Sequence, residues 1–180
     1  MHITEELDAG DIIFSKKLLI GDDETAGELH DRLSVLSAEL LSETLEAISR
    51  GKAVRIPQNN SEASFAPPLK KDISLIDWTN TALSIKNKVR GLNPWPIAMA
   101  ELGGTTYKIF AVDISDNKIA DKKPGEIVSA GRQGIEIACA DATVIVKELQ
   151  VPGGKRMMAG EYLNGHALGT WALGMGNEEF

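Results

Sequence analysis

The residue with the clearest capacity for chemistry is a loop aspartate near the start of the chain. Asp8 stands in the segment Leu7–Gly10, directly before the apolar residues that begin at Ile12. An ionised carboxylate accepts hydrogen bonds and can receive a proton during a reaction. The Asp-x-Gly spacing also favours a tight turn, because aspartate hydrogen-bonds to its own backbone. Spacing alone therefore favours a turn aspartate over a catalytic one.

Other reactive side chains are few and scattered. His2, His30 and His166 have no carboxylates near them at the spacing of a metal site. Cys139 is the single cysteine, which excludes an intramolecular disulfide and a cysteine zinc site. It lies in an apolar run, so we expect a small buried hydrophobic side chain. The sequence predicts no metal centre.

Charge is distributed unevenly along the chain. Residues 1–69 hold 6 basic and 13 acidic side chains, whereas residues 70–180 hold 13 of each, for a net charge of −7. Overall acidity disfavours nucleic-acid binding but leaves room for a local basic track. A solvated face of mixed charge explains the second part equally well. The candidate track consists of Lys70, Lys71, Lys86, Arg90, Lys155 and Arg156.

The first part of the chain predicts few elements. Residues 12–20 are apolar at both ends and predict a strand. Leucines recur at helical spacing from Leu29 onward, which predicts an amphipathic helix over residues 25–50 that needs an apolar surface to pack against. Three prolines and many small polar residues follow, and they predict a linker over residues 53–72.

The second part predicts a small β domain. A helix is expected after the N-cap Thr79, up to Gly91, followed by the rigid segment Asn93–Pro96. Short strands with turns at about ten-residue spacing indicate a small barrel or sandwich. A last short helix is expected at residues 159–165. The expected strands are residues 97–102, 105–114, 126–129, 134–138 and 143–149. No apolar run approaches the length of a membrane span.

The order of these motifs resembles the C-terminal portion of the methionyl-tRNA formyltransferase family. The motifs are Leu7–Ile12, Ile76–Trp78, Arg90–Pro96, Lys155–Met157 and the closing Tyr162–His166. The proline-flanked tryptophan segment is the most specific of them, and the ordered set covers essentially the whole chain. The resemblance implies an α+β fold and a cytoplasmic protein whose N-terminal portion is missing. It implies the tail of a Rossmann-like formyltransferase domain in residues 1–52, a linker in 53–72 and an OB-like β-barrel in 73–180 that contacts tRNA.

The resemblance also implies a reaction and its participants. The family transfers a formyl group from 10-formyltetrahydrofolate to the amino group of methionyl initiator tRNA, without a metal. Asp8 matches the catalytic aspartate of the family and Gly10 the glycine of its substrate loop. The six basic residues named above become candidate tRNA contacts, among which Lys71 matches a basic position of the family. The family's catalytic asparagine and histidine lie upstream of Met1, so we expect the isolated chain to be inactive. A separate upstream half of the enzyme is then a further partner.

Three alternatives stay open at this point. The first is another 10-formyltetrahydrofolate-dependent enzyme with the same two domains, such as a hydrolase or a sugar-amine formyltransferase. The second is a non-catalytic OB-like RNA-binding module. The third is a broken gene product whose exposed leucine stripe predicts aggregation or a partner chain.

Overall fold

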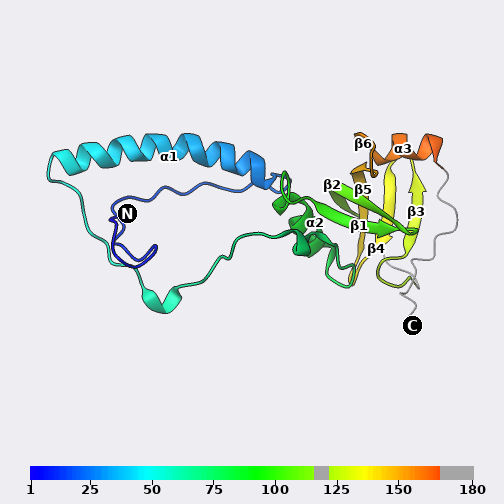
Figure 1. The fold of residues 1–180 in the computed structure, drawn as a ribbon, viewed down its shortest axis with the longest axis horizontal. Coiled ribbons are helices and arrows are strands. Elements are labelled where there is room, and N and C mark those ends of the chain that lie inside the picture. Colours follow the sequence, from blue (N-terminus) through cyan, green and yellow to red (C-terminus); the bar gives the residue numbers. More distant parts are fainter. Residues whose placement is uncertain (116–121, 167–180) are drawn as a thin grey trace. The chain divides into compact units, whose positions relative to one another are not determined.

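The computed structural model describes residues 1–115 and 122–166 of the 180-residue chain (Figure 1). The chain divides into two compact units, Met1–Pro68 and Leu69–Phe180. The sequence-based division into residues 1–52, 53–72 and 73–180 stays a prediction. In the described ranges, no helix combines the length and the apolar character needed to cross a bilayer.

The first unit contains the predicted long helix. Helix α1 spans Ala26–Ser49, and Thr25 caps it. The Thr25 hydroxyl accepts a hydrogen bond from the Glu28 amide, and the Glu28 carboxylate accepts one from the Thr25 amide at 2.8 Å. These contacts with Thr25 lower the pKa of the Glu28 carboxyl. None of the helix residues is fully buried, and Leu33, Leu45 and Ile48 remain 42%, 57% and 47% exposed.

The predicted strand over residues 12–20 does not form. Ile12 makes an isolated antiparallel bridge to Ile56, and the residues after it have no strand partner in the described ranges. Leu19 is 88% exposed as a result. Apolar residues at both ends of a segment are therefore insufficient here, because a strand also needs a neighbour to accept and donate its backbone hydrogen bonds. A short 3-10 helix, η1 (Asn60–Glu62), lies further along this unit.

The second unit is built on a six-stranded antiparallel sheet (Figure 1). The strand order is β1-β2-β5-β4-β3, and β6 also pairs with β5. Gly103 and Gly104 join β1 to β2, and both have the positive φ that a tight hairpin turn requires. The five predicted strands are confirmed within two residues at each end, whereas β6 was not predicted. The strands are β1 (Ala98–Leu102), β2 (Thr105–Ser115), β3 (Ile127–Gly131), β4 (Gly134–Ala138), β5 (Thr143–Gln150) and β6 (Arg156–Met158).

Helices complete this α+β unit. They are the 3-10 helix η2 (Lys71–Ser74), α2 (Ala82–Gly91) and α3 (Ala159–Gly165), the last as predicted. Thr81 caps α2, not Thr79 as predicted, because Thr79 is held by Asp77. The Asp77 carboxylate accepts hydrogen bonds from the Thr79 hydroxyl at 2.7 Å and from its amide at 3.0 Å. These bonds close an Asx turn before the helix and lower the pKa of Asp77.

One core lies between the sheet and its helices. α2 contributes Ile85 and Val89, which pack with Ile109 of β2 and Leu149 of β5. The partly buried side chain of Trp78 packs against this core. Cys139 is buried in the same cluster, as predicted, and burial raises the pKa of its thiol to about 11. The second unit therefore has a complete hydrophobic core of its own.

The two faces of α2 give a matched stability test. Ile85 is 1% exposed and Leu83 is 59% exposed. Ile85→Ala should lower the free energy of unfolding by about 2–5 kcal/mol, because it leaves a cavity in the core. Leu83→Ala should change it by about 0.5 kcal/mol or less. Urea titration followed by tryptophan fluorescence measures both, and equal effects would contradict this placement of α2.

The single cysteine provides a second test. With a thiol pKa of about 11, almost no reactive thiolate exists at pH 8 in the folded protein. We expect a thiol reagent such as DTNB to label Cys139 slowly in native buffer and rapidly in denaturant. Equally fast labelling in both conditions would show that the thiol is accessible in the native state.

Candidate functional site

The Asp8 loop is held through its backbone. The Gln58 side-chain amide donates hydrogen bonds of 2.7 Å to the carbonyl oxygens of both Asp8 and Gly10. Asp8 has a φ of 56°, a conformation that aspartate tolerates better than most residues. Its side chain is exposed, and its carboxylate has no hydrogen-bond or ion-pair partner in the described part of the chain. The loop is thus fixed while the acidic group keeps its capacity to accept hydrogen bonds.

Gly10 is required by a close approach of the backbone. The residue is buried, and a Cβ added there would lie 1.8 Å from the carbonyl oxygen of His2. The His2 amide also donates a 2.8 Å hydrogen bond to the carbonyl of Asp11. The close packing against the chain's own N-terminal segment therefore explains the glycine at this position. The substrate-loop role of Gly10 stays a prediction.

Residues from the predicted linker close the same loop. Arg55 Nε lies 2.8 Å from Asp11 Oδ2, and Ile56 exchanges backbone hydrogen bonds with Ile12. These contacts join residues more than forty positions apart, so no local pattern in the sequence indicates them. Gln58 is the loop-positioning residue that sequence reasoning missed.

The candidate basic residues all lie in the second unit. Lys70 is the N-terminal flanking residue of η2 and Lys71 begins that helix, and both are exposed. Lys86 and Arg90 stand four residues apart on α2, where Arg90 Nε donates a 2.8 Å hydrogen bond to Asn87. The predicted candidates from the linker and from the next helix are thus on consecutive elements.

Arg156 is already engaged by a carboxylate. Its Nε and one terminal nitrogen each lie 2.6 Å from a different oxygen of Glu148, across the β5–β6 pair. This bidentate pairing raises the pKa of Arg156. Its guanidinium also lies 4.4 Å from the centre of the Phe110 ring. The Glu148 carboxylate therefore balances much of the charge of Arg156. The adjacent Lys155 is also exposed.

Hydrogen bonds link these basic elements across the unit. Lys88 Nζ donates a 2.5 Å hydrogen bond to the Leu75 carbonyl, which joins α2 to the segment that follows η2. Asn93 donates a 3.3 Å hydrogen bond to the Phe110 carbonyl, beside the ring that Arg156 covers. A continuous series of neighbouring elements therefore connects Lys70 to Arg156.

Metal ligands do not gather in the described ranges. No group of three histidine, cysteine, aspartate or glutamate side chains is placed to hold an ion in residues 1–115 and 122–166. His30 is exposed on α1, and His166 hydrogen-bonds through Nδ1 to the Tyr162 carbonyl at 3.0 Å. The groups that the described residues offer for chemistry are therefore the exposed Asp8 carboxylate on its fixed loop and a set of surface cations.

Comparison with known proteins identifies the family. Residues 68–167 match the formyl transferase C-terminal domain. The chain is 42% identical over 166 residues to the methionyl-tRNA formyltransferase of Geotalea daltonii, which aligns 92% of this chain with 52% of that protein. It is 44% identical over 162 residues to the enzyme of the same name from Citrifermentans bemidjiense, with 90% and 50% aligned. The chain spans about half the length of the curated relatives it matches.

Solved structures share the fold at lower identity. HypX from Aquifex aeolicus matches with a TM-score of 0.64 and 20% identity, over 89% of this chain and 29% of that one. The N-formyltransferase from Helicobacter canadensis matches with a TM-score of 0.61 and 19% identity, over 80% and 52%. The chain therefore belongs to the formyl transferase family through its C-terminal domain, and the curated relatives that it matches are methionyl-tRNA formyltransferases.

Proposed function

We propose that this chain is the C-terminal portion of a cytoplasmic methionyl-tRNA formyltransferase. The observation that carries the proposal is its 42–44% identity with such enzymes over about nine-tenths of the chain. In this proposal residues 1–52 are the tail of a Rossmann-like catalytic domain, and residues 73–180 are an OB-like domain that contacts initiator tRNA. The exposed apolar residues of α1 support it, because they would be covered by a partner such as the rest of the catalytic domain.

Asp8 has a defined part in the proposed reaction. When the amino group of methionine attacks the formyl carbon, negative charge develops on the formyl oxygen and the amine becomes acidic. The Asp8 carboxylate accepts hydrogen bonds, so it suits the orientation of a catalytic histidine and the removal of the amine proton. It cannot stabilise the oxyanion, which needs donors. The proposal therefore assigns those donors to an asparagine and a histidine outside this chain.

The formyl donor in this proposal is 10-formyltetrahydrofolate. Proteins with the same fold have been solved with related molecules. HypX from Aquifex aeolicus has been solved with tetrahydrofolic acid, and the Helicobacter canadensis enzyme with folinic acid and dTDP-3-aminofucose. Asp8 has an exposed carboxylate on a loop fixed by Gln58, which supports its assignment in this proposal as the group of this chain that contacts the reacting atoms.

The aminosugar in the last of those structures favours one second candidate, a formyltransferase that acts on a sugar amine. Both candidates use the same carboxylate, so they differ only in the acceptor. Selective binding of methionyl initiator tRNA over an aminosugar nucleotide supports the first candidate, and the reverse preference supports the second.

Exposed lysines of the second unit predict salt-dependent tRNA binding. Lys70→Ala combined with Lys71→Ala should weaken binding of initiator tRNA and lower the slope of log Kd against log salt by about 1.5–2, because each lost phosphate contact contributes just under one. The matched control is Lys17→Ala with Lys52→Ala, which removes the same charge from exposed positions of the first unit. Fluorescence anisotropy measures both. Binding that is insensitive to salt, or equal losses in both variants, would contradict the proposed contact.

Substitution of Asp8 should cause a catalytic defect that can be measured only when the upstream portion of the enzyme is supplied. The isolated chain should show no formyl transfer, because the oxyanion donors are absent. When it is joined to the upstream portion of the Geotalea daltonii enzyme, Asp8→Asn should lower kcat by about 10²–10⁴. Asp22→Asn is the control, because it removes the same charge from another exposed loop position. Turnover by the isolated chain, or equal activity of the two variants, would overturn the assignment of Asp8.

A further inference from the structure

A hollow lies between the β3–β4 turn and α3, and none of the basic residues discussed above lines it. Its volume is about 280 Å³. Ala130 and Leu163 give it apolar walls, whereas Arg132, Asn164 and His166 place three polar side chains around it. The closing sequence motif, Tyr162–His166, contributes residues to this hollow and has no part in the proposed reaction.

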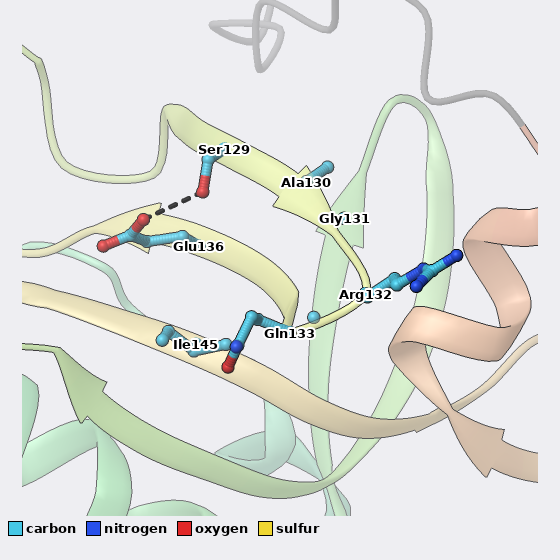
Figure 2. Close-up of a pocket in the computed structure, with 8 residues that line it drawn as sticks. Ser129, Ala130, Gly131, Arg132, Gln133, Glu136 and Ile145 are labelled. Atoms are coloured by element: carbon cyan, nitrogen blue, oxygen red, sulfur yellow. Dashed lines mark hydrogen bonds between the residues drawn. The ribbon is translucent and has the colours of Figure 1, made fainter.

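The frame of this hollow is tightly packed. Gly160 of α3 lies against the turn so closely that an added Cβ would sit 2.3 Å from the carbonyl oxygen of Arg132. Figure 2 shows the Arg132 side chain pointing toward the adjacent helix and away from Glu136. Its guanidinium has no ion pair within the described ranges. A fixed turn thus presents a planar cation with unused donors to the hollow.

Two stacked rings lie at the other side. The rings of Tyr162 and His166 are nearly parallel, 10° apart in orientation, with centres separated by 4.3 Å. Tyr162 is itself fixed, because its hydroxyl lies 3.1 Å from the hydroxyl of Tyr107. His166 lines the hollow and is exposed, so the stack offers a held aromatic surface there.

This combination suits an unpaired nucleobase. Bases in single-stranded RNA stack on aromatic rings and on arginine guanidinium planes, and side chains read their exposed edges. The Asn164 carboxamide supplies both donors and an acceptor, as such an edge requires. The apolar walls match the faces of a base. A planar, hydrogen-bonding ligand therefore fits every group around the hollow.

A phosphate group fits less well. Leu163, Asn164 and His166 belong to the last turn of α3 and its cap, where helix carbonyls without intrahelical partners carry partial negative charge. A neighbouring hollow of about 330 Å³ shares Arg132 but holds the Glu136 carboxylate, which is only 6% exposed. The Ser129 and Thr143 hydroxyls donate to that carboxylate at 2.9 and 2.6 Å, the first of which is drawn in Figure 2. Its negative charge also opposes an anion near Arg132.

We propose that the hollow between the β3–β4 turn and α3 binds one unpaired nucleobase of an RNA. The inference deepens the proposed function and rests on it, because it adds recognition of an unpaired nucleotide to the expected phosphate contacts. Arg132 and His166 stack on the base, and Asn164 binds its edge.

A titration with small ligands tests the hollow directly. Nucleosides, ribose 5-phosphate and inorganic phosphate are added separately to the full chain labelled with ¹⁵N. Nucleosides alone should shift the amide signals of Ala130, Leu163, Asn164 and His166, whereas the two phosphates should not. Shifts with inorganic phosphate but not with nucleosides would make this an anion site, and no shift with any ligand would exclude a site. Either result overturns the proposal.

Two substitutions separate stacking from charge. Arg132→Lys keeps the positive charge but loses the planar guanidinium, so it should weaken nucleoside binding about tenfold. Asn164→Ala should abolish differences in affinity among the four nucleosides. Arg50→Lys, the same change at an exposed arginine of the first unit, should leave binding unchanged. Wild-type affinity of Arg132→Lys would overturn the stacking role.

Binding of intact initiator tRNA distinguishes a failure of this inference from a failure of the proposed function. If the wild-type chain binds initiator tRNA with salt dependence but shows no nucleoside shifts, this inference fails and the proposed function stands. If it binds nucleosides at the hollow but discriminates no tRNA, the proposed acceptor fails while the base site stands.

Discussion

Pairing along β5 is the interaction on which the second unit depends. β5 joins β2 on one edge and β4 on the other, and its last residues also pair with β6. Its core-facing residues Val144, Val146 and Leu149 are fully buried. A break in this strand would separate β1 and β2 from β3 and β4, because the sheet order places it between them. The positions of β6 and of the β3–β4 turn therefore depend on β5.

Each end of β5 contacts a residue that lies close to a candidate binding surface. At its C-terminal end, Glu148 holds Arg156 of β6 by two short hydrogen bonds, and Lys155 directly precedes that strand. At its N-terminal end, Thr143 donates to Glu136 on β4, the carboxylate beside the β3–β4 turn. β5 thus contacts both the strand that begins after Lys155 and the strand that leads from the turn with Arg132. The proposed phosphate contacts near β6 and the proposed base site near the β3–β4 turn therefore both depend on β5.

Apolar patterns in the sequence predicted most of the helices and strands. The five strands and α2 lie in the core, where burial repeats along each element, and α1 follows from its helical leucine spacing although none of its residues is fully buried. β6 was missed because it has three residues, too few for a period, and depends on its pairing with β5. The strand predicted over residues 12–20 failed for the opposite reason, since it has a pattern but no neighbouring strand. Thr79 was misread as a cap because Asp77 competes for its hydroxyl.

The catalytic role of Asp8 stays a prediction, and the geometry of its loop could not be predicted from the sequence. The type and position of Asp8 come from a recognisable motif, whereas Gln58 and Arg55 act on its loop from across the predicted linker. These contacts engage backbone carbonyls and Asp11 and leave the Asp8 carboxylate alone. Glu136 and Glu148 differ, because hydroxyls or a guanidinium already occupy their oxygens. A carboxylate that is fixed by its backbone but unpaired at its side chain retains the acceptor capacity that proton transfer requires. That difference, rather than sequence position, distinguishes Asp8 from these structural carboxylates.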